Sequence, residues 1–306
     1  MSWKLSDGFL VFSIPPHNGI RLLTLQPNAQ LKTIFESSLL IGWIAALSFE
    51  IAAATAMLDE IHTTLPSDFN DHNSYTLWSI LGDNVVIACL PASVNGATSA
   101  AIVAAHMLFT FPEIRFGLMV GIGGGAPSDK VDIRLGDVVV SEPADGVGGV
   151  IQYDYGTVTS GGSFQRTGAL NKPPLVLLAA VNQLKAKVVM KNNNIPLNKS
   201  QIAMRYPKIS KFTCSGNSQD HLYKVNYEHV GGNTCDHCSK IQIMNRQSRP
   251  SADSAIHYGL IASGNQVMKH AATRDRLAQE LGILCFEMEA AGLIDPQVNQ
   301  QIKQPH

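Results

Sequence analysis

The segment 116–141, FGLMVGIGGGAPSDKVDIRLGDVVVS, constrains the fold more than any other part of this sequence. It reads as a buried strand, a glycine-rich turn at 121–125, a polar loop and a second strand. Glycines leave the backbone free to adopt positive φ and to lie close to a ligand. Successive N–H groups in such a turn can hold an anion or the oxygens of a sugar. The segment predicts either a ligand-binding turn, centred on Gly121, Gly123 and Gly124, or a tight turn with a purely structural role.

A dinucleotide-binding motif is the competing interpretation, because Gly121, Gly123 and Ala126 fit the pattern G-x-G-x-x-A. That motif opens a helix whose N-terminus carries the pyrophosphate of the cofactor. Here Pro127 follows at once, and no apolar pattern with a 3.6-residue period appears before the strand at Asp137. The sequence therefore favours no nicotinamide cofactor at this turn, and we expect no cofactor elsewhere.

Composition and charge exclude several classes of partner. The chain has 306 residues, of which 45% are apolar, enough for the core of one large α/β domain. A formal net charge of -1 gives no electrostatic footprint for nucleic acid or for an anionic membrane. No apolar run reaches the roughly 18 residues of a spanning helix, and the first residues lack the pattern of a signal peptide. Five widely spread cysteines indicate a reducing compartment, so we expect a cytoplasmic protein.

Apolar strand-like runs alternate with helical patterns through most of the chain. This alternation predicts an α/β fold with a mostly parallel, twisted central sheet flanked by helices. The expected strands are 40–47, 74–81, 84–90, 117–120, 137–141, 258–262 and 283–286, and the expected helices are 50–62, 97–109, 175–191 and 271–281.

Three segments fall outside this alternation and set the expected domain boundaries. Residues 1–38 show no clear period and contain three prolines, so we expect an N-terminal extension. The domain itself is expected at 39–293, with a polar, irregular insertion at 192–254. Residues 294–306 form a short polar tail.

Glu50 lies where a buried strand gives way to an alanine-rich helix. The helix dipole alone favours a carboxylate in the first helical turn, which is one sufficient explanation. The other is functional, because ligands of α/β proteins bind where parallel strands end. The sequence leaves both explanations open.

A second acidic group follows the last buried strand, where Glu287 and Glu289 flank Met288. An extended backbone would place both carboxylates on one face and Met288 on the other. Buried carboxylates demand partners, and sugar hydroxyls suit a carboxylate because it offers only acceptors. The structural alternative is that Glu289 begins and caps a helix.

The insertion at 192–254 contains a C-x-x-C pair, Cys235 and Cys238. A zinc site would need two further ligands, which Cys214 with His221 or His229 could supply. The spacing matches no standard zinc finger. An unliganded loop is therefore the favoured interpretation, and we predict no metal site.

Taken together, four motifs resemble the purine nucleoside phosphorylase and uridine phosphorylase superfamily: IGWIAALSFEIAAATAML, VGIGGGAPS with DIRLGDVVVS, YGLIASGNQV, and LCFEMEAAGL. The resemblance runs from about Leu40 to Leu293. Within the superfamily the chain is most similar to the nucleosidase branch, and above all to the nucleoside-phosphorylase-like domain of fungal NACHT, NB-ARC and ankyrin-repeat proteins. This resemblance implies a three-layer sandwich and a purine nucleoside or nucleotide as the small-molecule partner. Members of the superfamily tend to self-associate, so it also implies a homo-oligomer.

The resemblance implies catalytic roles for two of the segments described above. Glu50 matches the glutamate that activates the attacking water in nucleosidases. Gly121, Gly123 and Gly124 match the turn that faces the ribose and the nucleophile. The implied reaction is attack on the anomeric carbon through an oxocarbenium-like transition state, with protonation of the departing purine.

The remaining matched positions imply a binding site for the nucleoside. Val267 and Met268 match positions that line the purine. Met288 matches the residue packed beneath the ribose, Glu289 binds the ribose hydroxyls, and Glu287 lies beside them.

The sequence also departs from the pattern of the family. It leaves that pattern at Ile294, so the later strand with the aspartate that protonates the purine is not among the printed residues; Asp295 does not follow a strand and is not assigned that role. We therefore expect a domain truncated at its C-terminal end. Ile122 stands where nucleosidases have serine, and Val267 replaces an aromatic ring that stacks on the base.

Two functions follow from these matches and departures. The first is an enzyme that cleaves the N-glycosidic bond of purine nucleosides or nucleotides. The second is a catalytically impaired remnant, or a nucleoside-sensing module, that lacks the acid for the leaving group. The sequence leaves open the substrate, the oligomeric state, and the choice between hydrolysis and phosphorolysis.

Overall fold

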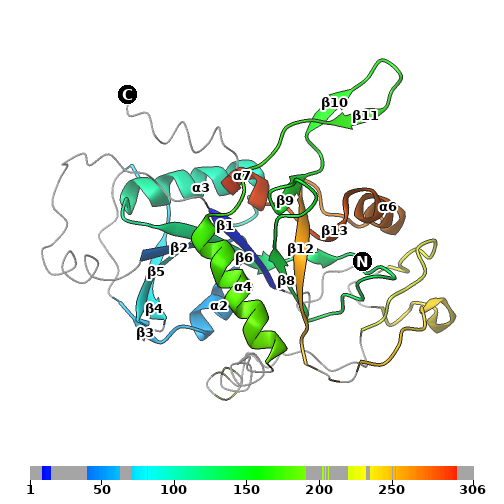
Figure 1. The fold of residues 1–306 in the computed structure, drawn as a ribbon, viewed down its shortest axis with the longest axis horizontal. Helices are drawn as coiled ribbons and strands as arrows, with labels where there is room; N and C mark the ends of the chain where they lie inside the picture. The colour runs from blue at the N-terminus through cyan, green and yellow to red at the C-terminus, as the bar shows by residue number, and fades with distance from the viewer. Residues whose placement is uncertain are drawn as a thin grey trace, which may run out of the picture.

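The computed structural model describes residues 9–14, 40–62, 70–80, 82–190, 202, 204, 206, 220–231, 235–249, 251 and 253–294 (Figure 1). The strands are β1 (Phe9–Ile14), β2 (Leu40–Ala45), β3 (Glu60–Ile61), β4 (Tyr75–Ile80), β5 (Asp83–Cys89), β6 (Phe116–Ile122), β7 (Gly124–Gly125), β8 (Val138–Ser141), β9 (Val150–Gln152), β10 (Gly156–Val158), β11 (Phe164–Arg166), β12 (Ile256–Ser263) and β13 (Ile283–Glu287). The helices are α2 (Ser48–Ala56), α3 (Ala97–Thr110), α4 (Leu175–Val189), α6 (Ala271–Leu281) and α7 (Ala290–Ile294), with a 3₁₀ turn η3 (Lys240–Gln242).

Most strands join one mixed sheet in the order β3-β4-β5-β2-β6-β1-β8-β12-β13-β7, with β9 paired to β12. Six of the ten pairings among these described strands are parallel, which confirms the α/β fold with a mostly parallel sheet. The remaining two strands, β10 and β11, form a separate hairpin that projects from the body of the protein (Figure 1).

Helices cover both faces of the sheet around β2, β5 and β6. Val85 and Ile87 of β5 pack in a cluster with Ala54 of α2, whereas Val86 and Ala88 pack in a second cluster with side chains of α3. This alternation follows from the two-residue period of a strand. The result is a three-layer arrangement in which the ends of β2 and β6 are buried beneath helices.

The half of the sheet from β6 to β7 curls round on itself. Only Gly123 separates β6 from β7, yet β1, β8, β12 and β13 lie between them in the order of the sheet. In addition β1 is antiparallel to β6, and β7 is antiparallel to β13. The end of β13 is therefore brought back towards the end of β6, although the two strands are far apart in the sequence.

Strand β1 corrects the expected boundary at residue 39. We assigned residues 1–38 to an extension outside the domain, but Phe9–Ile14 pairs with β6 on one side and with β8 on the other. The backbone ladder decides the position of this strand, and the irregular sequence around it gave no periodic signal. The boundaries at 192–254 and 294–306 remain predictions, since much of both segments lies outside the described residues.

The first helix is shorter than its sequence pattern predicts. The expected helix extended to His62, whereas α2 ends at Ala56, and Glu60 and Ile61 form β3 against β4. Pairing with an existing strand outweighs the helical propensity of this short segment. By contrast, the hairpin of β4 and β5, the helices α3 and α6, and Gly282 as a left-handed residue at the end of α6 are confirmed.

Helices α3 and α7 touch so closely that a glycine is needed between them. A Cβ atom built on Gly292 of α7 would lie 1.8 Å from the backbone oxygen of Ala97 in α3. A backbone atom cannot rotate away, so the two helices would have to separate. We expect Gly292→Ala to lower the free energy of unfolding by about 1–3 kcal/mol, measured by urea denaturation. Gly161→Ala is the matched control, because nothing lies within 4 Å of its added Cβ; equal stability of the two variants would contradict this packing.

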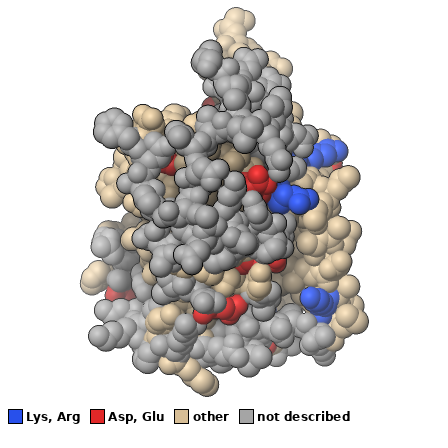
Figure 2. All heavy atoms as spheres, turned by 90° about the vertical axis from the view of Figure 1, so that its left-hand side faces the viewer, with Lys and Arg blue, Asp and Glu red and all other residues tan. Residues whose placement is uncertain are grey.

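The described surface shows no concentration of one charge on the face drawn in Figure 2. There the described Lys, Arg, Asp and Glu side chains are scattered rather than gathered into a patch. Among the described helices, none is both long and apolar enough to cross a bilayer.

Candidate active site

Glu50 is buried at the junction of β2, α2 and β6. Its carboxylate Oε2 accepts hydrogen bonds from the N–H groups of Ala46 at 2.7 Å and Leu47 at 2.9 Å, so it caps the start of α2. Its Oε1 accepts a third hydrogen bond, from the N–H of Ile122 at 2.8 Å. The structural and the functional explanations of Glu50 are therefore compatible, because capping holds the carboxylate against the end of β6.

The glycine segment is extended and does not form the turn that we predicted. Gly121, Gly123, Gly124 and Gly125 are not among the glycines with positive φ. Gly121 instead provides space, because a Cβ built on it would lie 2.7 Å from Oε1 of Glu50. Gly121 is thus needed for the close approach of Glu50, and β7 pairs with β13, where Gly124 lies opposite Phe286.

Glu287, the last residue of β13, and Glu289, two residues later, have different roles in the structure. Oε2 of Glu287 accepts hydrogen bonds from the N–H groups of Glu289 and Ala290, both at 2.8 Å, so Glu287 caps α7. The sequence alternative had given this capping role to Glu289. Oε1 of Glu289 instead accepts from the N–H of Gly96 at 3.1 Å, at the start of α3. Both side chains are 7% exposed, and Met288 between them is half-buried.

Glu50 and Glu289 interact electrostatically, as one common site for both would require. Burial is the main factor that raises the pKa of Glu289, and the negative charge of Glu50 raises it further. Desolvation and a nearby like charge both disfavour the ionised form of a carboxyl group. A Cβ atom on Gly121 would meet Glu50, and Gly124, three residues later, pairs with Phe286 of β13, so this segment connects Glu50 to the strand that precedes Glu289.

The pKa values of all three carboxyl groups are raised. Burial raises the pKa of Glu50, and its three backbone hydrogen bonds oppose this effect. Burial also raises the pKa of Glu287, with the charge of Glu289 as the next cause. Hydrogen bonds from the Ser263 side chain and from the N–H groups of Glu289 and Ala290 oppose the rise in the pKa of Glu287. Carboxyl groups with raised pKa values in one buried site can take up and release protons near neutral pH.

Gly96 and Asn265, to which the sequence analysis gives no role, lie near Glu289 at the start of α3. Gly96 has φ of 104°, and a Cβ on it would lie 2.9 Å from Oδ1 of Asn265. Asn265 accepts a hydrogen bond from the N–H of Ala97 at 3.2 Å, and its own N–H donates to Asp154 at 2.7 Å. The turn that carries Asn265, directly after β12, was visible in the sequence, but nothing there showed that it reaches α3.

Val267 and Met268 remain predictions as residues that line the purine. Val267 is 42% exposed, and Met268 packs against the apolar cluster that contains Leu260 and Phe286. Neither residue has a hydrogen bond or a cluster contact that joins it to Glu50 or Glu289 within the described part of the chain.

The raised pKa of Glu287 predicts that the protein becomes less stable as the pH rises. The folded state keeps this carboxyl protonated above the ordinary glutamate pKa of about 4.3, whereas the unfolded state releases the proton. The free energy of unfolding should therefore fall as the pH rises from about 4.5 through neutrality, by up to about 1.4 kcal/mol per pH unit from this group. Glu287→Gln should flatten that slope in urea denaturation between pH 5 and 8. Glu113→Gln, at an exposed position, should retain it, and an unchanged slope in Glu287→Gln would contradict the assignment.

Comparison with known proteins begins with the sequence. No family model matches this chain. Over 256 residues, 83% of this chain, it is 44% identical to a nucleotide-binding leucine-rich repeat (NLR)-like protein of Hyaloscypha variabilis. The aligned region covers 25% of that relative, so this chain spans about a quarter of its length.

Two solved structures illustrate the similarity of fold. Futalosine hydrolase of Helicobacter pylori matches 88% of this chain over 82% of its own, with a TM-score of 0.50 and 14% sequence identity. A putative 5'-methylthioadenosine/S-adenosylhomocysteine nucleosidase of Francisella philomiragia matches 87% of this chain over 81% of its own, with a TM-score of 0.47 and 17% identity. The mixed, mostly parallel sheet flanked by helices is thus an α/β fold that this chain shares with futalosine hydrolase.

Proposed function

We propose that this protein binds a purine nucleoside or nucleotide and cleaves its N-glycosidic bond. One observation carries the proposal: Glu50, buried against Gly121 at the end of β6, is near enough to the buried Glu289 for its charge to raise the pKa of Glu289. The fold supports it, since futalosine hydrolase shares this architecture.

Glu50 is the proposed general base. Its Oε2 is occupied by two N–H groups, whereas Oε1 accepts one, from Ile122. A carboxylate oxygen can accept two hydrogen bonds, so Oε1 retains a lone pair for a water molecule. A raised pKa makes this carboxylate a better proton acceptor near neutral pH. That water is the proposed nucleophile at the anomeric carbon.

Glu289 is the proposed partner of the ribose. Its carboxylate makes two hydrogen bonds, with the N–H groups of Gly96 and Met288, which leaves acceptor capacity for sugar hydroxyls. Negative charge at this position also stabilises the oxocarbenium-like transition state. Among the described residues, backbone N–H groups rather than Lys or Arg side chains contact Glu50 and Glu289. A phosphate nucleophile needs cationic or clustered donors, so water is favoured.

An assay of purine release tests the proposal. The full chain is incubated with adenosine, methylthioadenosine and ATP, and the free base is separated by chromatography. We expect release from at least one substrate, and a large loss of that release in Glu289→Ala but not in Glu113→Gln. No release above background from any substrate would remove the enzymatic proposal for this chain.

Binding without cleavage would identify the alternative, a nucleoside-sensing module. Calorimetric titration of the same compounds separates the two functions, because a sensor binds without releasing base. If Glu289→Ala binds as tightly as the original chain, the proposed ribose site is wrong for either function. Self-association and a cytoplasmic location remain predictions.

A further inference from the structure

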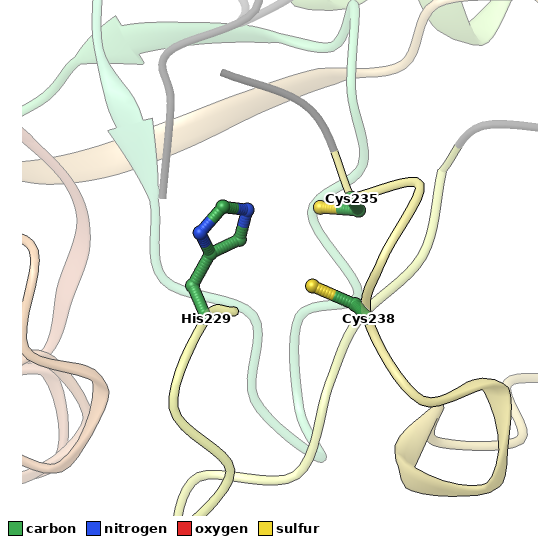
Figure 3. A group of neighbouring side chains, drawn as sticks. All are labelled: His229, Cys235 and Cys238. Carbon is green, nitrogen blue, oxygen red and sulfur yellow. The ribbon is translucent and has the colours of Figure 1, made fainter. Parts of the chain in front are cut away.

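Three side chains that commonly bind metal ions come together in the loops that precede η3. One ligand atom each of His229, Cys235 and Cys238 lies within 4.8 Å of the others, and the three side chains point towards a common centre (Figure 3). Cys238 is buried, and the other two residues are half-buried. No other group of three His, Cys, Asp or Glu side chains with this spacing occurs in the described part of the chain.

The local backbone holds the two cysteines in position. The N–H of Cys238 donates to the carbonyl of Cys235 at 3.0 Å, which closes a tight turn and presents both thiols on one side. The next residue, Ser239, donates its N–H to the hydroxyl of Tyr227 at 2.7 Å. Tyr227 also stacks on Tyr223, with ring centroids 5.4 Å apart. The loop that carries His229 is thereby joined to the loop that carries the cysteines.

The distances suit a small tetrahedral metal ion. Zinc bonds of about 2.3 Å to sulfur and about 2.0–2.1 Å to nitrogen separate tetrahedral ligand atoms by roughly 3.5–3.8 Å. A group within 4.8 Å needs only a small contraction to reach that spacing. Two thiolates and one imidazole select zinc over magnesium or calcium, which prefer oxygen ligands.

We propose that His229, Cys235 and Cys238 bind one zinc ion. The three ligands come from a segment of the chain different from those that carry Glu50, Glu289 and the glycine segment. The sequence offered His221 or His229 as the histidine, and the geometry selects His229. Cys214, the remaining candidate from the sequence, lies outside the described residues, so the fourth coordination position is left to water or to a further side chain.

The zinc ion would join the loop that carries His229 to the turn that carries Cys235 and Cys238, both within the segment 220–249. At the two ends of this segment, Asp220 and Arg246 form an ion pair at 2.5 Å, and Arg246 also pairs with Asp132 at 3.1 Å. Tyr223 pairs with Ile243 in an isolated bridge. Between these ends the segment has little apolar core, so a metal is the kind of crosslink that such a loop needs.

Metal analysis of the full chain tests the proposal. The protein is purified under reducing conditions from cells supplied with zinc, and bound metal is measured by inductively coupled plasma mass spectrometry. We expect about one zinc ion per chain, and loss of that zinc to the level of the buffer in His229→Ala, Cys235→Ser and Cys238→Ser. His237→Ala and Cys89→Ser are the matched controls, and both should retain the zinc.

Cobalt substitution supplies a readout that does not depend on the folding of variants. After zinc removal, titration of the original chain with Co²⁺ should produce the thiolate charge-transfer and tetrahedral d–d bands of a site with sulfur ligands. A folded original chain without zinc and without these bands would overturn the proposal. Recovery of Cys235 and Cys238 as a disulfide from a reducing preparation, again without zinc, would overturn it as well.

Discussion

Replacement of Glu50 by glutamine is expected to lower the rate of purine release by about 10²–10⁴-fold, the usual contribution of a general base. Glutamine has nearly the same shape, but its amide cannot take a proton from water. It also cannot satisfy all three N–H donors, because its NH₂ group would face either Ile122 or the pair Ala46 and Leu47. Some loss of stability therefore accompanies the loss of rate.

The measurement must separate these two effects. We propose steady-state kinetics of base release for Glu50→Gln at a temperature where circular dichroism shows the variant to be folded. Glu113→Gln makes the same chemical change at an exposed position and should leave the rate unchanged. A folded Glu50→Gln protein with the rate of the original chain would exclude Glu50 as the base, whatever the outcome for Glu289.

Replacement of Asp137 by alanine is expected to lower the free energy of unfolding by about 3–5 kcal/mol, the cost of breaking a buried ion pair by removal of one partner. Asp137 is 2% exposed and receives hydrogen bonds from both Nη atoms of Arg249, at 2.7 and 2.6 Å. The backbone N–H groups of Arg134 and Ala255 also donate to it. Alanine would leave all of these donors without their acceptor.

Urea denaturation at neutral pH measures this loss, and Asp129→Ala is the control. Asp129 belongs to the same loop but is exposed, so its replacement should change stability by less than about 0.5 kcal/mol. An equal, small effect of both substitutions would show that Asp137 does not hold β8 to the segment around Arg249.

The pH dependence of this interaction has the opposite sign to that of Glu287. Burial alone would raise the pKa of Asp137, but hydrogen bonds from His257, Arg249 and the backbone outweigh it and hold the pKa well below the usual range. A carboxylate with a lowered pKa stabilises the fold above its unfolded pKa of about 3.9, and that stability is lost as the pH falls. The difference in stability between the original chain and Asp137→Ala should therefore shrink below about pH 4.

Local patterns predicted the elements whose formation depends on near neighbours. The alternation of apolar residues in β5, the alanine-rich pattern of α3 and the glycine at the end of α6 are confirmed because each acts over a few residues. The same reasoning failed for β3 and β1, which exist because of partners elsewhere in the sheet.

The candidate site also combines features set by neighbouring residues with features set by distant segments. The sequence singled out Glu50, Glu289 and the glycines as unusual, since carboxylates beside buried strands need a reason. From the sequence, these residues are expected to meet at one edge of the sheet, where parallel strands end. In the structure β13 runs in the opposite sense to β7, and the curl of the sheet returns the end of β13 to the end of β6. The common site of these residues stays a prediction, whereas the route by which the strand ends approach one another differs from the expected one.

By itself the sequence determined the residue types at the ends of the strands and the α/β class, because chemistry and short-range periodicity are written in consecutive residues. Only the tertiary structure decided that Gly121 makes room for Glu50, that Glu287 caps a helix while Glu289 reaches Gly96, and that His229 joins the two cysteines. The contacts of Gly121 with Glu50 and of Glu289 with Gly96 depend on which distant segments pack together. Residue spacing does not encode that pairing, because it arises from the closure of the whole sheet.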